Sequence, residues 1–235
     1  MQRAIHQLVR VRHDPVPCLD GIYFDHAPRL ARETQLTMKE MERVKKWMLI
    51  GLISLMAVLA ACSNEIEDPL NWEIESFNYM NQNEEMVSLD DLKGKVWMAD
   101  FVFTNCETVC PPMTYNMTKL NEALVEEGVE DVQFVSFSVD PTVDTPDKIQ
   151  AFMADYDLAK ADWQFLTGYS QEEIEAFAQQ NFKALVRKPS EGTQVDHATW
   201  FYLVDQDGKI IKAYQGFQDV PIEDIVNDIK ILQNS

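Results

Sequence analysis

The sequence predicts an α/β sandwich with a mixed central sheet and helices on both faces. Two observations carry this prediction. After residue 61 about 174 residues remain, enough for one domain with its own core, and 46% of the whole sequence is hydrophobic against 25% charged. Strand and helix signals then follow the order strand, helix, strand, two helices, hairpin and terminal helix, which is typical of such a sandwich.

The first elements surround the two cysteines of the domain. Residues 77–89 predict a small hairpin, and residues 95–103 are a mostly apolar run that is typical of a buried central strand. Behind two consecutive prolines a helix runs up to Gly128, because apolar residues recur on one of its faces, namely Met113, Met117, Leu120 and Leu124. We therefore expect the two methionines to pack in the core rather than to bind a metal.

The remaining elements complete the sandwich. They are strand 132–140, helix 144–156, helix 171–182, two strands within 199–216 around a turn at Asp207 and Gly208, and helix 221–232. The helix at 144–156 has Asp144 or Thr145 as its cap and Pro146 in its first turn. A thioredoxin-like topology is the most economical fit to this order of elements.

An apolar run near the N-terminus indicates the compartment. It covers the fifteen residues 47–61 behind a short charged stretch, which is shorter than the roughly 20 residues that span a bilayer and fits a secretory signal. The run ends in "LAAC", which is similar to the site where bacterial lipoproteins are cut and lipidated, here at Cys62. The alternative is an uncleaved signal anchor. Both place the domain outside the cytoplasmic membrane, and we expect a lipid anchor on its outer face.

These signals divide the chain into four parts. Residues 1–37 precede the signal, so we expect a misassigned start, with translation beginning at Met38 or Met41. The signal then covers 38–61, an acidic tether 62–72 and the folded domain 73–235. Residues in front of the signal fall outside the working protein, namely Cys18, His6, His13 and His26. Cys106, Cys110 and His197 remain for chemistry.

The charge of the chain excludes one class of partner. Residues 1–61 hold nine of the 20 Lys/Arg and six of the 39 Asp/Glu, which leaves 11 basic and 33 acidic residues and a formal charge of −22 for the rest. Nucleic acid is a poor partner for such a surface. We interpret the acidic residues as a solvated coat rather than as a functional feature.

Cys106 and Cys110 stand four residues apart where the buried strand meets the helix. Neither Pro111 nor Pro112 has a backbone N–H, so the helix most naturally starts at this pair, with Cys110 at its start and Cys106 in the preceding loop. The positive end of a helix favours the thiolate, which is both a nucleophile and a metal ligand. The spacing brings both sulfurs to one point, and a redox couple or a metal site satisfies this geometry.

Three readings compete for this pair. A structural disulfide would close a very short loop and stabilise little. A dithiol couple of the thioredoxin type usually has two residues between its cysteines, and here there are three. His197 stands just before a predicted core strand, close to the reactive edge of the sheet, and would complete a set of two sulfurs and one nitrogen. Such a soft set suits copper, whereas structural zinc would need a fourth ligand.

At this point the sequence resembles a known family. "NCETVCPPMT", "SVDPTVDTP", "WQFLTGYS" and "DHATWFYLVDQDGKI", in this order and behind a lipoprotein-like signal, are similar to the Sco/SenC family, named for the synthesis of cytochrome c oxidase. The resemblance covers about residues 73–235. It implies a thioredoxin-like fold with an added N-terminal hairpin, and copper, as Cu(I) or Cu(II), bound by Cys106, Cys110 and His197.

The resemblance also implies a partner and a task. The partner is cytochrome c oxidase subunit II, whose copper A centre the protein would help to mature, with other copper carriers or thiol reductants as further contacts. The alternative is a thiol–disulfide oxidoreductase that reduces the subunit's cysteines, Cys106 and Cys110 being its redox-active pair, without delivering copper. Asp140 on the same edge is either an acid behind the metal ligands or a turn-capping residue before Pro141.

Overall fold

The structure, a computed structural model, describes residues 38–50, 65–156, 158 and 161–235. The chain divides into two units, residues 1–63 and residues 64–235. In the first unit residues 38–50 are helical and exposed. The predicted extension 1–37, the rest of the predicted signal and Cys62 lie outside the described residues. Among the residues that are described, no helix combines the length and apolar character needed to cross a membrane.

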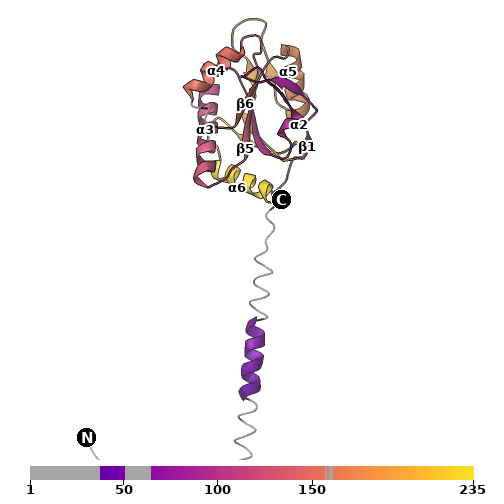
Figure 1. Cartoon of the computed structure of the whole chain (residues 1–235), viewed down its shortest axis with the longest axis vertical. Coiled ribbons are helices and arrows are strands. Elements are labelled where there is room, and N and C mark those ends of the chain that lie inside the picture. The colour runs from indigo at the N-terminus through magenta and orange to yellow at the C-terminus, as the bar shows by residue number, and fades with distance from the viewer. Residues whose placement is uncertain (1–37, 51–64, 157, 159–160) are drawn as a thin grey trace, which may run out of the picture. The chain divides into compact units, whose positions relative to one another are not determined.

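A six-stranded mixed sheet forms the centre of the second unit (Figure 1). Its order is β1 (Trp72–Glu73), β10 (Lys209–Gln215), β9 (Trp200–Val204), β4 (Val96–Val102), β5 (Val132–Ser138) and β6 (Trp163–Leu166). Strands β4, β5 and β6 run parallel, and the other neighbours pair antiparallel. The mixed sheet and the hairpin of β9 and β10 confirm the predicted fold class. Leu70 and Trp72 already bond to this sheet, although residues 62–72 were expected to form a tether.

The central strands are buried because helices cover both faces of the sheet. All seven positions of β4 and all seven of β5 are buried, as expected for parallel strands of this kind. The covering helices are α3 (Cys110–Glu126), α4 (Pro146–Asp155), α5 (Gln171–Phe177) and α6 (Ile222–Gln233). In Figure 1, α3 and α5 lie on opposite sides of β5 and β6. The helices on both faces were predicted correctly.

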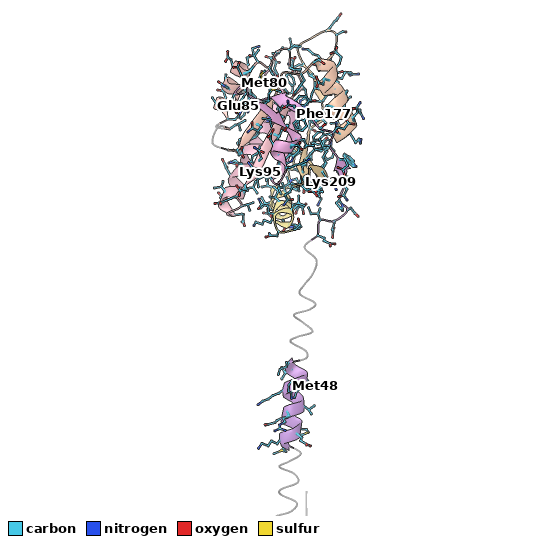
Figure 2. The ribbon with its side chains drawn as sticks, turned by 45° about the vertical axis from the view of Figure 1, so that its right-hand side comes forward. Met48, Met80, Glu85, Lys95, Phe177 and Lys209 are labelled. Atoms are coloured by element: carbon cyan, nitrogen blue, oxygen red, sulfur yellow. The ribbon has the colours of Figure 1, made fainter. Side chains whose placement is uncertain are left out.

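The predicted N-terminal hairpin is present and is fixed to the sheet. It consists of β2 (Asn78–Met80) and β3 (Met86–Ser88), and the short helix α2 (Leu89–Leu92) follows with Ser88 as its cap. Met80 exchanges two backbone hydrogen bonds with Thr167, just after β6. Figure 2 labels Met80 and Glu85 on this hairpin.

Two local features differ from the prediction. The helix expected over 171–182 is α5 followed by a π-helical turn, η2 (Ala178–Phe182), which ends where Lys183 adopts a left-handed φ of 54°. A second small hairpin joins β7 (Val186–Arg187) to β8 (Asp196–His197). His197 therefore lies in a two-residue strand of its own, just before the core strand β9 as the sequence indicated. Both features lie next to the predicted metal site.

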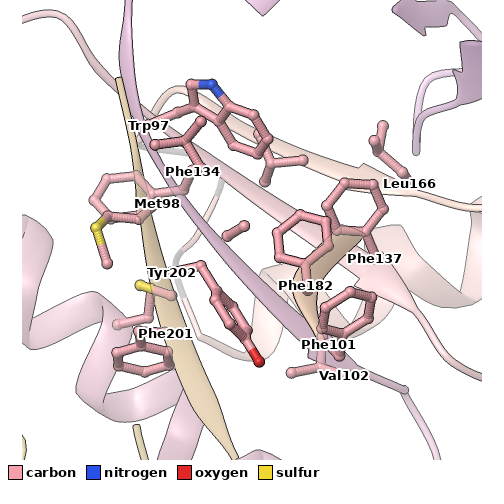
Figure 3. Packing of buried hydrophobic residues seen from close by; sticks show 14 of the residues in the cluster. Trp97, Met98, Phe101, Val102, Phe134, Phe137, Leu166, Phe182, Phe201 and Tyr202 are labelled. Carbon is pink, nitrogen blue, oxygen red and sulfur yellow. The ribbon is translucent and has the colours of Figure 1, made fainter. Parts of the chain in front are cut away.

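Aromatic side chains pack beneath the carboxyl end of β4. The ring centroids of Phe101 and Phe137 are 5.5 Å apart, and Phe182 lies edge-on to Phe101 at 5.1 Å and to Tyr202 at 5.0 Å (Figure 3). Phe177, labelled in Figure 2, adds a further ring to this layer. Met113 and Met117 are buried in the same core, which confirms their predicted packing role. The layer gives the loops above it a rigid base.

Candidate metal centre

Three side chains that can bind a metal converge at one end of the sheet. Cys106 lies in the loop after β4, Cys110 is the first residue of α3, and His197 is the last residue of β8. One donor atom from each lies within 4.8 Å of the other two. The structure thus brings together the three residues that the sequence singled out. Cys106 and Cys110 are both free and form no disulfide.

The start of α3 places the two sulfurs. Val109 is the N-cap residue, and the prolines directly after Cys110 occupy the first turn, where a missing N–H costs no helical hydrogen bond. The free N–H of Cys110 donates to Sγ of Cys106 at 3.3 Å. The Cys106 sulfur therefore lies at the positive end of the helix, which stabilises its negative charge.

The two thiols differ sharply in acidity. A hydrogen bond from the Cys110 thiol, helped by the backbone N–H groups of Thr108 and Cys110, lowers the pKa of Cys106 to about 3 against the opposing effect of burial. Burial, reinforced by the neighbouring Cys106 sulfur, raises the pKa of Cys110 far above its usual value. At neutral pH the pair therefore carries one proton, with a half-buried thiolate at Cys106 and a buried thiol at Cys110.

His197 faces Cys110 with its unprotonated nitrogen. Nε2 lies 3.3 Å from Sγ of Cys110, and Nδ1 lies 3.0 Å from the carbonyl oxygen of Ala198. Because a carbonyl oxygen only accepts, Nδ1 carries the proton and donates it there, which leaves the Nε2 lone pair directed at the sulfurs. Phe103 packs edge-on against the imidazole at 5.8 Å and limits its rotation.

The hairpin that carries His197 is fastened at two further points. Gln194, in the loop between β7 and β8, donates to the carbonyl of Asn105 at 3.0 Å and accepts from the N–H of Glu107 at 3.3 Å. At the other end of that loop Lys188 forms an ion pair with the buried Asp140. These contacts position the hairpin against the cysteine loop.

Asp140 is a turn residue and an anchor for this hairpin. Its Oδ1 accepts from the Thr142 hydroxyl at 3.0 Å and from the Lys188 ammonium. No hydrogen bond joins it to Cys106, Cys110 or His197 in the part of the chain that the structure describes. The turn-capping alternative therefore fits the observed contacts. Its contact with the hairpin that carries His197 is the ion pair with Lys188.

Asp144 has a structural role that its sequence context did not show. Thr145 is the N-cap residue of α4 without a side-chain hydrogen bond, so neither predicted cap forms that bond. Asp144 is buried and instead accepts from the Thr104 hydroxyl at 2.6 Å and from the Ser138 hydroxyl at 2.6 Å. It thereby ties the loop that leads to Cys106 to the end of β5. Burial raises the pKa of Asp144, while its hydrogen bonds with Ser138 and Thr104 oppose that rise.

The donor set selects among metals. Two sulfurs and one imidazole form a soft, three-coordinate set, which suits copper and above all Cu(I). Structural zinc takes four protein ligands, and the group within the described residues contains three. The nearest buried acid on β4, Asp100, is bonded to the Ser136 hydroxyl at 2.6 Å and is not a member of the group.

The fold and the site define a class of protein: a thioredoxin-like dithiol protein with a histidine directed at its cysteines. Residues 68–233 match the family described as SCO1/SenC, and the chain belongs to this family. The SCO1 protein homolog of Bacillus subtilis (strain 168) is 51% identical over 189 residues, which cover 80% of this chain and 96% of that protein.

Solved structures share the fold. One is a structure of BsSco, which is described as having a disulfide switch and as a member of the Sco family of cytochrome c oxidase assembly proteins. BsSco is 53% identical to this chain, and the two structures have a TM-score of 0.67. The match covers 72% of this chain and 98% of that one. A more distant structure is Bradyrhizobium japonicum ScoI with copper bound, 24% identical with a TM-score of 0.56, covering 68% and 99% of the two chains. At that distance the similarity shows the fold alone.

Proposed function

We propose that the protein is a copper chaperone that binds copper through Cys106, Cys110 and His197 and helps to mature the copper A centre of cytochrome c oxidase subunit II. The convergence of three soft donors within 4.8 Å carries this proposal. Membership of the SCO1/SenC family supports it. So does the description of BsSco, 53% identical to this chain, as a member of a family of oxidase assembly proteins.

The protonation state of the three ligands determines how many protons copper displaces when it binds. Cys106 offers a thiolate that needs no deprotonation, because its pKa is about 3. His197 offers the lone pair of Nε2, held in place by the bond from Nδ1 to the Ala198 carbonyl. Cys110 must release its proton as its sulfur bonds to the ion. Each copper ion therefore displaces one proton from the cysteine pair.

Release of copper requires a second set of ligands. Thiolates of the recipient would replace the three donors one by one, and the half-buried Cys106 is the sulfur that they reach more easily. Oxidation of the pair to a Cys106–Cys110 disulfide would release two electrons to an external oxidant and remove both sulfur ligands. Copper affinity should consequently be lost under oxidising conditions.

A thiol–disulfide reductase is the second candidate function. The half-buried thiolate at Cys106 would attack a disulfide of the target, and Cys110 would then displace the target sulfur, which closes the Cys106–Cys110 bond and leaves two target thiols. The marked difference in acidity within the pair favours this reading. The very low pKa of Cys106 argues the other way, since intrinsic nucleophilicity falls with pKa. This reaction does not need His197.

We also propose that lipid on Cys62 anchors the domain to the outer face of the cytoplasmic membrane. The support is the "LAAC" sequence behind an apolar run. Labelling with a radioactive fatty acid that gives no incorporation into the wild-type chain would refute this part.

Two measurements separate the two functions. Copper titration of the reduced domain should show strong binding that Cys110→Ser and His197→Ala each weaken, because each removes one of three ligands. Copper affinity that both variants leave unchanged would exclude the chaperone. Oxidase activity in cells is the second measurement, with and without added copper. A His197→Ala variant that supports full oxidase assembly without added copper would favour the reductase.

A further inference from the structure

A cavity opens directly beside the candidate metal centre. Its volume is about 660 Å³, which lies within the usual range for ligand sites. Its walls are formed by the segment that leads into β1, the end of η2, the region from β8 to β9, and strand β10. The principal lining residues are Trp72, Phe182, Lys183, His197, Trp200 and Tyr202. His197 is both a candidate metal ligand and a wall of the cavity. Anything bound in the cavity therefore lies next to the metal.

Aromatic side chains form a large part of the walls of the cavity. Trp72, Phe182, Trp200 and Tyr202 contribute aromatic rings, and the side chains at the rim are exposed, with Trp200 at 42% and Leu185 at 56% of their full area. Exposed tryptophan next to a concave apolar surface is typical of a protein interface. The preferred occupant thus presents an apolar side chain.

The charge at this cavity differs from the charge of the domain. Residues 62–235 carry a formal charge of −22, and most lysines of the described domain already pair with a carboxylate, namely Lys93, Lys95, Lys119, Lys188, Lys209, Lys212 and Lys230. Lys183 forms no ion pair with any described residue; its ammonium donates to the Gln180 carbonyl and lies 6.0 Å from the ring centroid of Trp72. The lining contains one carboxylate, that of Asp68.

From these observations we propose that the cavity docks an extended segment of the protein that accepts the copper. An apolar side chain of that segment enters between Trp72, Trp200 and Tyr202, and a neighbouring carboxylate pairs with Lys183. The inference rests on the proposed function, because ligand exchange requires the acceptor to contact the surface next to His197. Because no described carboxylate pairs with the Lys183 ammonium, this charge favours an anionic occupant over a cationic one.

The test uses copper transfer to the purified copper A domain of the host's oxidase subunit II. Two variants change the cavity and leave the three metal ligands intact: Trp200→Ala removes an exposed apolar wall, and Lys183→Glu reverses the charge. Lys148→Glu is the matched control, because Lys148 is an exposed lysine on α4 that forms no ion pair with the described residues. Affinity for copper alone is measured in parallel for every variant.

Both cavity variants should keep the copper affinity of the wild type and bind the subunit domain about tenfold more weakly, with slower transfer. Lys148→Glu should behave as wild type, and added salt should weaken the binding of wild type more than that of Lys183→Glu.

Normal binding and transfer in both cavity variants would overturn the docking inference while leaving the chaperone function in place. Wild-type protein that binds copper but never transfers it would overturn both. Loss of self-association in Trp200→Ala, with normal transfer, would assign the cavity to a second copy of the chain instead.

Discussion

Gln194 holds the backbone on both sides of Cys106. Its side-chain oxygen accepts from the N–H of Glu107 and its side-chain nitrogen donates to the carbonyl of Asn105. Three residues further along, His197 directs Nε2 at the second cysteine. A single amide therefore couples the strand that carries the imidazole to the loop that carries the thiolate. The distance between Sγ of Cys106 and Nε2 of His197 depends on this contact.

Replacing Gln194 should loosen the metal site without unfolding the domain. Gln194→Ala removes both hydrogen bonds to the cysteine loop, and we expect copper affinity to fall about tenfold, as is usual for residues that orient metal ligands. Competition against a Cu(I) chelator measures this affinity. Gln194→Glu keeps the acceptor oxygen and loses the donor nitrogen. Its copper affinity should therefore lie between that of wild type and that of Gln194→Ala.

The control for this change is Gln179→Ala, an exposed glutamine on η2 that makes no side-chain hydrogen bond with the described residues. The same variants should also differ in the rate at which Cys106 reacts with a thiol reagent, because the loop becomes more mobile in Gln194→Ala. Equal affinity and equal reactivity in Gln194→Ala and Gln179→Ala would refute the positioning role.

Asp100 reduces stability at neutral pH. This carboxyl is buried in the middle of β4, and its Oδ2 has no hydrogen-bond partner among the described residues. Burial raises the pKa of Asp100 to about 6, while the bond from Ser136 and the proximity of His197 oppose the rise. A raised pKa means that the folded state holds the proton more tightly. Stability from this group is therefore complete below about pH 4 and is lost as the pH rises through about 6.

The corresponding prediction concerns Asp100→Asn. The amide keeps the acceptor for Ser136 and carries no charge, so the variant should be about 1–2 kcal/mol more stable than wild type at pH 8. At pH 4, where the wild-type carboxyl is protonated, the gain should disappear. Urea unfolding at the two pH values measures both numbers. A gain of the same size at pH 4 and pH 8 would show that charge burial is not the cause.

Much of this fold could be predicted because its signals are local. Strand β4 is a continuous apolar run, the prolines after Cys110 mark the start of α3, and the turn at Asp207 and Gly208 separates β9 from β10. Gly208 adopts a φ of 85°, which suits glycine at such a turn. The placement of Cys110 at the first residue of a helix follows from the same signals.

The support around the metal centre could not be predicted in this way. Strands β7 and β8 have two residues each and pair across an eight-residue loop, so no periodicity reveals them. Gln194 is a polar residue in that loop, and its contacts depend on how the chain returns to Asn105. Asp144 has the sequence of a helix cap, but the buried hydroxyls of Thr104 and Ser138 compete for its carboxylate. These contacts are products of tertiary packing.

Copper binding should release about one proton over a wide pH range. Cys106 contributes none above about pH 5, because its pKa of about 3 leaves it ionised, whereas the buried Cys110 contributes one. Calorimetric titration in two buffers of different ionisation enthalpy counts the protons. Near pH 8 we expect about one proton per copper ion in wild type and about none in Cys110→Ser. Release of two protons in wild type would contradict the assignment of a thiolate to Cys106.

The ion pair of Lys188 with Asp140 gives the last prediction. Asp140 is 1% exposed at its side chain and Lys188 is 26% exposed, so removing the lysine leaves a buried carboxylate without its cation. Lys188→Met should lower stability by about 2–3 kcal/mol and should also weaken copper binding, because the hairpin that carries His197 loses its anchor. Adding Asp140→Asn to Lys188→Met should restore part of the stability, since the uncompensated charge is gone, but should not restore copper affinity.

Lys93→Met, which breaks an exposed ion pair with Asp90, is the control and should change neither stability nor copper affinity measurably. If Lys188→Met matched Lys93→Met in urea unfolding and in copper competition, the anchor would have no role in holding His197 at the site.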